Sequence, residues 1–257
     1  MRIFTIAQNN KKNKISFKAV VFWIVLWQIA SMIISKEILL VSPISALKKL
    51  AELAVTFEFW KVIFFSFTRI FIGFFLAVII SVIFAIFSSK YKLFRDLIYP
   101  PILVMQSVPV ASFIILCLIW ISTKNLSIFI SFIMVFPIIY TNILQGIEET
   151  DVELLEMAKV FNISSIKKIR YIYLWQVIPY FKSSCNVSLG LAFKAGIAAE
   201  VIGIPKGSIG ERLYESKIYL NTDELFAWTI LIVILSIILK KLFIFLLNYI
   251  LKYMERS

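Results

Sequence analysis

The chain has 257 residues, of which 61% are hydrophobic and 16% are charged, and this composition excludes a soluble globular domain. Its formal net charge is +12, but the basic residues lie in short clusters between apolar stretches, which indicates membrane topology rather than a nucleic-acid partner. Histidine is absent, and Cys117 and Cys185 lie far apart within apolar segments, so the sequence offers no zinc site of the usual spacing and no CxxC redox pair. We therefore predict an integral membrane protein embedded in a lipid bilayer.

Hydropathy predicts six membrane-spanning helices, each close to the roughly 20 residues that a bilayer requires. The start of the chain, residues 1–18, is basic and polar, and no small-residue cleavage site follows the first apolar run, so we expect the first span to be retained. We predict an all-α membrane protein with an N-terminal cytoplasmic segment at 1–18 and one six-span domain at 19–250. The expected spans lie near residues 19–35, 62–89, 97–121, 126–146, 181–204 and 225–247.

A short amphipathic helix is predicted between the first two spans. Ser42 is a suitable N-cap, Pro43 stands at an early helical position, and apolar residues recur with the 3.6-residue period of a helix. Such a helix is expected to lie at the membrane surface.

The distribution of lysine and arginine predicts the orientation. The N-terminus, the connection at 90–95, the segment at 159–182 and the tail from Lys240 hold about twice as many basic residues as the opposite connections. We therefore expect both termini and the segment at 148–180 to be cytoplasmic. The helix after Ser42, the Thr123-Lys124 turn and the connection at 205–224 are expected to face outward.

Residues 148–180, which we call the polar segment, interrupt an otherwise apolar chain. Apolar residues within 151–161 are spaced as in a helix, with acids first and a lysine later. Asn162 tolerates the left-handed conformation and is expected to end this helix in a sharp corner, after which Ser164-Ser165 would cap a second helix. A helix, a corner and a helix, with the small Ala158 at the contact face, would suit docking into a groove on a soluble partner.

The polar segment resembles the EAA loop of ABC-importer permeases, whose pattern is Glu-Ala-Ala, three residues, Gly, nine residues and Ile-x-Leu-Pro. The resemblance implies a cytoplasmic coupling helix that docks on the ATP-hydrolysing subunit. The positions that match at the same spacing are Glu156, Ala158, Ile172 and Leu174.

Three positions depart from that pattern. Met157 replaces the first alanine, Asn162 replaces the glycine and Trp175 replaces the proline. Asparagine preserves the chemistry of the corner, while the start of the fifth span is expected to be straighter without the proline. The residues that the resemblance assigns to ATPase coupling are Glu156, Ala158, Lys159, Phe161, Asn162 and Ile163.

Further motifs are similar to the permeases of the nitrate, sulfonate, taurine and bicarbonate importer family, in order across residues 40–235. They are Leu40-Val-Ser-Pro43, Ser66-x-x-Arg69 with Gly73-Phe74, Pro100-x5-Gln106-x2-Pro109, Phe136-Pro137, and Ala198-Ala199-Glu200 with Gly210.

This wider resemblance implies a type I ABC importer fold in a prokaryotic plasma membrane. It also implies a homodimer that works with two copies of a cytoplasmic ATPase and with an extracytoplasmic solute-binding protein. ATP and Mg would be bound by the ATPase, so no cofactor is expected on this chain. The expected solute is a small organic or inorganic anion or a vitamin precursor.

Charged residues within spans are costly, so Arg69, Lys194 and Glu200 each require a partner or a role. Arg69 and Glu200 are expected at matching depth in the outer half of the membrane, where an ion pair between them would either fix the fold or take part in gating. Lys194 would lie near the axis of a homodimer and attract an anionic solute, or it would extend its ammonium group to the membrane surface.

Other polar residues are candidates for the translocation pathway. Gln106 and Ser107 follow Pro100-Pro101 and precede Pro109, which are expected to interrupt the third span. Ser188 belongs to a set of small residues on the fifth span that fits either close helix packing or a pathway lining.

Two other classes of function are considered. A secondary transporter or channel would need an ion relay within the spans and no ATPase. A membrane enzyme, such as a lipid transferase, would need a cluster of carboxylates or histidines at the interface. Because the sequence has no histidine and Glu200 is the main acid within a span, we expect no catalytic residue.

Overall fold

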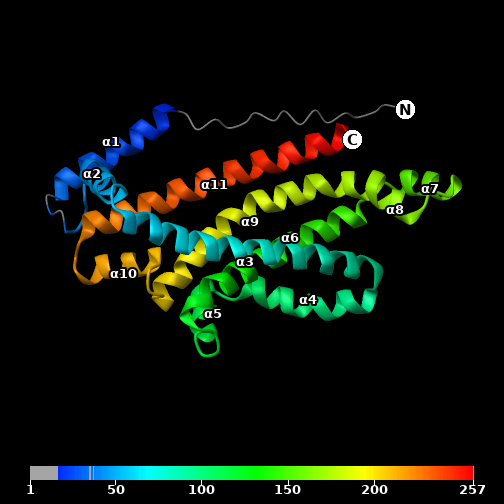
Figure 1. Cartoon of the computed structure of the whole chain (residues 1–257), viewed down its shortest axis with the longest axis horizontal. Coiled ribbons are helices and arrows are strands. Elements are labelled where there is room, and N and C mark those ends of the chain that lie inside the picture. The colour runs from blue at the N-terminus through cyan, green and yellow to red at the C-terminus, as the bar shows by residue number, and fades with distance from the viewer. Residues whose placement is uncertain (1–16, 35, 37, 257) are drawn as a thin grey trace.

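A computed structural model of the protein describes residues 17–34, 36 and 38–256, and every regular element in this part of the chain is helical (Figure 1). The predicted N-terminal segment at 1–18 lies almost entirely outside the described residues. The helices are α1 Phe17–Ile34, α2 Pro43–Ala54, α3 Phe57–Lys90, α4 Lys92–Ser107, α5 Val110–Cys117, α6 Thr123–Glu148, α7 Val152–Val160, α8 Ser165–Lys168, the π-helix η1 Ile169–Tyr173, α9 Leu174–Gly203, α10 Ile209–Ile218 and α11 Thr222–Arg256.

The core of the bundle is formed by α6 packed between α3 and α9. Small residues allow these helices to approach closely. A Cβ atom added at Gly73 of α3 would lie 2.3 Å from the backbone oxygen of Ile128 on α6, and one added at Gly196 of α9 would lie 2.5 Å from Ile70 on α3. The three central helices therefore meet with almost no intervening side chain.

Serine hydroxyls connect the same three helices. Ser81 on α3 donates to the carbonyl oxygen of Phe136 at 2.9 Å. Ser131 on α6 donates to the carbonyl oxygen of Ala192 on α9 at 3.1 Å. Because a buried hydroxyl without a partner is costly, these bonds fix the relative positions of the helices as well as satisfying the serines.

The structure shows four helices in the described region that are long and apolar enough to cross a membrane, which are α3, α6, the continuous Ser165–Gly203 helix and α11. A fifth crossing is possible if α4 and α5 together form one span, although they are bent by 109°. The apolar part of α1, Lys18–Ile34, is shorter than these spans. The all-helical membrane architecture is confirmed, whereas the count of six spans stays a prediction.

The predicted interruption of the third span at 97–121 is confirmed at Pro109, where α4 ends and α5 follows. Val108 has extended backbone angles (φ −77°, ψ 131°), and Pro109 starts the next helix. A residue before proline is sterically disfavoured from the helical region, and proline lacks the N–H group that would continue the helix. Pro100 and Pro101, which were expected to interrupt this span, lie inside α4.

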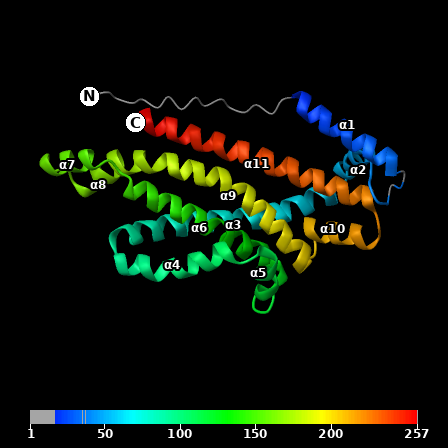
Figure 2. The same ribbon diagram turned by 180° about the vertical axis from the view of Figure 1, so that it is seen from behind.

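The connections gather at two opposite ends of the bundle, as Figures 1 and 2 show from front and back. One end carries α2 and α10, and the other carries α7, α8, the link between α3 and α4, and the end of α11. The predicted amphipathic helix is confirmed as α2, with Ser42 accepting from the Ser45 N–H at 3.1 Å. The connection at 205–224, expected as a loop, contains α10.

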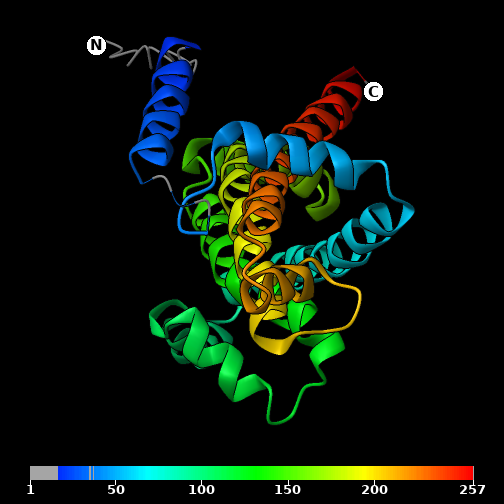
Figure 3. The ribbon, with the colours of Figure 1, turned by 90° about the vertical axis from the view of Figure 1, so that its left-hand side faces the viewer.

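The helix α1 lies at the side of the bundle (Figure 3). It is attached near α2, where Trp27 donates to the carbonyl oxygen of Val41 at 3.0 Å and Ser31 donates to that of Leu40 at 3.0 Å. Most of its apolar side chains are exposed, including Trp23 and Met32. An apolar helix exposed on most sides is suited to contact with lipid or with another membrane helix.

Candidate functional site

The helix α7 begins and ends where the sequence predicts. The side chain of Asp151 caps its start by accepting from the Glu153 N–H at 2.8 Å. Asn162 follows its end with a φ of 48°, in the left-handed region. The predicted helix at 151–161 and the corner at Asn162 are both confirmed.

Backbone hydrogen bonds fix the corner. The Ile163 N–H donates to the carbonyl oxygen of Ala158 at 2.9 Å, and the Asn162 N–H donates to that of Lys159 at 3.1 Å. These are the two bonds of a Schellman motif, which requires a left-handed residue at the position of Asn162. The direction in which the chain leaves α7 is therefore set by local geometry.

The chain continues from the corner without interruption. Ser164 is the N-cap of α8, as predicted, and α8, η1 and α9 form one continuous helix over Ser165–Gly203. The π-helix η1 lies just before Trp175, and the straighter start of the fifth span stays a prediction. We call residues 151–168 the elbow, and its second arm is thus the beginning of a central helix of the bundle.

The elbow lies at one end of the molecule (Figure 1), and several of its apolar side chains are exposed. Phe161 is 73% exposed, and Glu156, Lys159 and Asn162 are also exposed, while Ile163 is half-buried. A cluster of exposed apolar residues on and next to α7, which is not one of the candidate spans, marks an interaction surface for another protein or for a membrane. The further exposed apolar residues of the elbow and of η1 are Val152, Met157, Val160, Ile166 and Ile169.

The expected role of Ala158 is wrong. It was placed at the contact face of the elbow, but its exposure is 0%, so the chain's own atoms cover it. The Ile163 N–H of the corner donates to the Ala158 carbonyl oxygen, so the chain folds back beside this position. The candidate contact surface is therefore formed by the exposed residues on the other faces of α7, with Ala158 as internal packing.

Side chains join residues 148–149, at the end of α6 just before the elbow, to α4 and α9; we call these contacts the clamp at the base of the elbow. Arg95 of α4 forms an ion pair with Glu148 at the end of α6. Tyr180 of α9 donates to Glu149, which also accepts from the Gln145 amide at 2.8 Å. The hydrogen bond from Tyr180, and then that from Gln145, lowers the pKa of the Glu149 carboxyl.

Close packing strengthens the same clamp. Gly146 of α6 lies against the ring of Tyr180, where an added Cβ atom would be 2.9 Å from Cδ2. These contacts connect the end of α6 to α4 and α9 at the point where the chain enters the elbow. The sequence analysis did not identify the contacts among Arg95, Glu148, Glu149 and Tyr180. The only signal for them in the sequence is that Glu148, Glu149 and Tyr180 lie at the two ends of the polar segment.

The pathway candidates are not gathered in one place. Lys194 is exposed and lines a groove of about 500 Å³ between α9 and α11, together with Gly190, Phe193, Ile232 and Ser236 among others. Gln106 and Ser107 are exposed at the end of α4, and neither lines this groove. Ser188 is buried within the bundle, and its hydroxyl has no hydrogen-bond partner among the described residues.

The predicted ion pair between Arg69 and Glu200 is absent from the described part of the chain. The Arg69 guanidinium donates to the carbonyl oxygen of Lys124 and lies 3.9 Å from the centre of the Phe65 ring. Arg69 thus contacts the start of α6 and a ring of its own helix instead of the Glu200 carboxylate.

Glu200 is 1% exposed and lies where α3, α9 and α10 meet. One of its oxygens accepts from the Ser66 hydroxyl at 2.6 Å and from the Gly210 N–H at 3.4 Å. Ser66 in turn accepts from the Ile209 N–H at 2.9 Å. Hydrogen bonds to the serine and the backbone thus replace the expected arginine.

These features define a class of protein, a multi-span helical membrane protein with an exposed, clamped elbow at one end. The chain belongs to the family of binding-protein-dependent transport system inner membrane components, which matches residues 77–256. The family assignment made from the EAA-like loop and the accompanying motifs is therefore confirmed.

The chain is also similar to individual transport permeases. The putative aliphatic sulfonates transport permease protein SsuC of Bacillus subtilis is 24% identical, covering 83% of this chain and 78% of the relative. The taurine transport system permease protein TauC of Escherichia coli is 23% identical, covering 83% and 80%. A probable ABC transporter permease protein of Brucella melitensis is 23% identical, covering 80% and 83%. The chain is thus similar to ABC importer permeases over most of its length.

Proposed function

We propose that this chain is the permease subunit of an ATP-binding-cassette importer, and that its elbow docks on a separate cytoplasmic ATPase. The observation that carries the proposal is the elbow itself, a corner at Asn162 with Phe161 and Val160 exposed beside it. An apolar surface outside the bilayer requires a protein partner. Glu156 and Lys159 add charges of both signs that would orient the partner.

The clamp at the base of the elbow provides the mechanical connection. When the ATPase dimer closes on ATP, it moves the elbow, and the contacts of Glu148 and Glu149 pass the motion to α4, α6 and α9. The bundle has inward-open and outward-open states, and the ATPase biases the equilibrium between them. ATP and Mg are held by the ATPase, and this chain carries out no catalysis.

The complete importer contains two copies of this chain, two ATPase subunits and an extracytoplasmic solute-binding protein that docks at the end with α2 and α10. The chain crosses a prokaryotic plasma membrane with both termini in the cytoplasm.

The solute is a small organic or inorganic anion or a vitamin precursor. The names of the relatives, which mention aliphatic sulfonates and taurine, favour an anion, and the exposed Lys194 on α9 supplies the matching charge.

Co-purification with the ATPase tests the proposal. The tagged chain is expressed with candidate ATPases, and capture is compared for the wild type, Phe161→Glu and Leu93→Glu. Leu93 is a matched control because it is 75% exposed and belongs to the first turn of α4, outside the elbow. The start of α4 lies at the same end of the molecule as α7 (Figure 1). We expect Phe161→Glu to abolish capture and Leu93→Glu to retain it.

Transport distinguishes the alternative function. Proteoliposomes that contain the chain alone, or the complete importer, are tested for uptake of radiolabelled taurine and of an alkanesulfonate. We expect uptake only with the ATPase and ATP. Equal capture by Phe161→Glu would show that the elbow is not the docking surface. Uptake by the chain alone along an ion gradient would replace the ABC mechanism with a secondary transporter or channel.

A further inference from the structure

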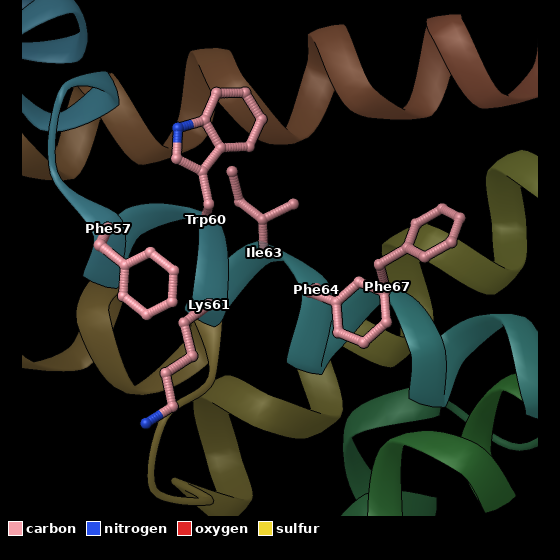
Figure 4. A pocket seen from close by; sticks show the side chains of 6 residues that line it. All are labelled: Phe57, Trp60, Lys61, Ile63, Phe64 and Phe67. Atoms are coloured by element: carbon pink, nitrogen blue, oxygen red, sulfur yellow. The ribbon is translucent and has the colours of Figure 1, made fainter.

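A groove on the outer surface of α3 is not used by the proposed import mechanism. It has a volume of about 490 Å³ and is shown in Figure 4. In that view Lys61 and Phe57 lie near the start of the helix, while Phe64 and Phe67 lie further along it. The lining residues are Phe57, Trp60, Lys61, Ile63, Phe64 and Phe67.

The groove continues along the same helix. A second hollow of about 300 Å³ shares Phe67 with the first and extends to Ile79. From Lys61 to Ile79 a helix rises about 27 Å, which is close to the roughly 30 Å of a bilayer's hydrocarbon core. The two hollows therefore follow the whole apolar thickness of a membrane.

Stacked phenylalanines give the groove a preformed wall. The rings of Phe67 and Phe71 are stacked with centroids 5.0 Å apart, and Phe71 meets Phe75 edge to face at 4.7 Å. Phe67 also contacts Phe193 of α9, with centroids 6.3 Å apart, so the wall is attached to the core. Aromatic rings held by such pairs lose little freedom when an apolar chain lies against them.

The positively charged side chain of Lys61 lies at one end of this apolar surface. Lys61 is exposed, and no ion pair joins it to another described residue. The acidic residue one turn earlier, Glu58, is paired with Arg212, so it does not neutralise Lys61. Next to Lys61, Trp60 donates to the carbonyl oxygen of Ala54 at 2.9 Å and stays 57% exposed. Tryptophan and lysine together mark the level of lipid headgroups.

We propose that this groove is a binding site for an anionic phospholipid, with the phosphate against the Lys61 ammonium group and one acyl chain along the phenylalanine wall. The unpaired cation selects a headgroup with net negative charge, and the length of the groove suits an acyl chain. The site does not depend on the elbow or on the ATPase, so it stands apart from the proposed import function.

Native mass spectrometry of the purified full-length chain tests this site. The protein is extracted in detergent with equal amounts of phosphatidylglycerol and phosphatidylcholine that carry the same acyl chains. Because one lysine at a membrane surface favours an anionic lipid by about fivefold, we expect the wild type to retain about five times more phosphatidylglycerol. Lys61→Ala should reduce the ratio to about one, and Lys61→Arg should preserve it.

Two further variants test a control lysine outside the site and the second hollow within it. Lys217→Ala removes an exposed lysine of α10, at the same end of the molecule, and should leave the lipid ratio unchanged. Thr68→Trp fills the second hollow, which Thr68 lines, and should reduce the retention of both lipids. The mass spectrum reports the oligomeric state in the same measurement.

Three outcomes would overturn the proposal. Equal retention of the two lipids by the wild type would mean that only bulk lipid surrounds α3. A preference for phosphatidylglycerol that survives Lys61→Ala would move the headgroup site elsewhere. A lipid-free dimer that Thr68→Trp converts to monomers would show that a second copy of the chain, and not a lipid, occupies the groove.

Discussion

The hydroxyl of Ser66 on α3 lies 2.6 Å from the carboxylate of Glu200 on α9 and donates a hydrogen bond to it, and both residues are buried. Ser66 also accepts from the Ile209 N–H at the start of α10, at 2.9 Å. One hydroxyl therefore connects two membrane helices to the short helix at the α2 and α10 end of the bundle. The position of α10 therefore depends on the hydrogen bond from the Ile209 N–H to Ser66, which an apolar side chain at position 66 could not accept.

Removing this hydroxyl should destabilise the protein. Ser66→Ala leaves the Ile209 N–H without its acceptor and Glu200 without its nearest donor, and a buried group that loses its partner costs about 1–3 kcal/mol. For a chain of this size, each kcal/mol lowers the melting temperature by about 2–4 °C. Thermal unfolding in detergent measures the change.

Ser89→Ala is the matched control, because Ser89 is exposed at the other end of α3 and donates only to its own helix, at 2.8 Å from the Ile86 oxygen. We expect its effect to stay within about 0.5 kcal/mol. An unchanged melting temperature for Ser66→Ala would mean that the cluster around Glu200 does not hold α10.

Gly210 should not tolerate a side chain at the start of α10. A Cβ atom there would lie 2.3 Å from the backbone carbon of Glu200 and 2.4 Å from its Cβ, so Gly210→Ala forces α10 away from α9. Overpacking of this kind costs about 1–3 kcal/mol. Gly190→Ala on α9 is the control, since an added Cβ meets nothing within 4 Å and alanine favours a helix.

The expected order of thermal stability is therefore Gly190→Ala at or above the wild type, and Gly210→Ala below it. If both variants unfold at the same temperature, α10 is not packed against Glu200 as the structure shows.

Local features of this fold could be predicted from the sequence because each depends on neighbouring residues. The cap at Ser42, the start of α7 at Asp151 and the left-handed corner at Asn162 follow from side-chain chemistry within a few positions. Their positions in the structure agree with the prediction for that reason.

Features that depend on contacts between distant helices could not be predicted in the same way. Arg69 and Glu200 were paired by their charges and expected depth, but the actual partner of each is set by the rotation and tilt of α3, α6 and α9. Pro109 was expected to interrupt the third span, but the 109° bend between α4 and α5 could not be predicted, because an average over about 20 residues carries no direction. The burial of Ala158 likewise depends on how the corner folds back.

Replacing Asn162 tests the corner of the elbow. A β-branched residue in the left-handed conformation costs more than the roughly 1–2 kcal/mol of an ordinary residue, so Asn162→Val should distort the corner. Asn162→Gly should preserve it, since glycine adopts a φ of 48° without strain. We expect Asn162→Val to lose ATP-driven uptake in proteoliposomes while the melting temperature of the bundle stays near that of the wild type.

Asn162→Gly serves as the control, and uptake by this variant should match the wild type. Normal uptake by Asn162→Val would mean that the geometry of the corner is irrelevant to transport.

The ion pair between Arg95 and Glu148 is suited to a double-mutant cycle. The two side chains are 46% and 42% exposed, so the ion pair should add only about 0.2–1 kcal/mol to stability. Its larger effect should be on coupling, because it joins α4 to the base of the elbow. We expect Arg95→Glu and Glu148→Arg each to raise the ATP hydrolysed per solute transported, and the double exchange to restore the ratio. Additive losses in the double variant would show that the pair carries no coupling.

We predict that Lys194 gives the translocation pathway its preference for anionic solutes. It is exposed on α9 in a groove whose other lining residues are uncharged, so it offers an anion a single cationic partner in surroundings of low polarity. Losing a hydrogen bond to a charged group costs about 1.5 kcal/mol or more, which predicts that Lys194→Ala raises the apparent KM for an anionic solute about tenfold. Lys194→Arg should retain most of the affinity, and Ser236→Ala, in the same groove, should change it little. Uptake kinetics of the complete importer measure all three, with expression and ATPase capture as checks on assembly. If Lys194→Ala transports with the KM and maximal rate of the wild type, the ammonium group serves only to reach the membrane surface.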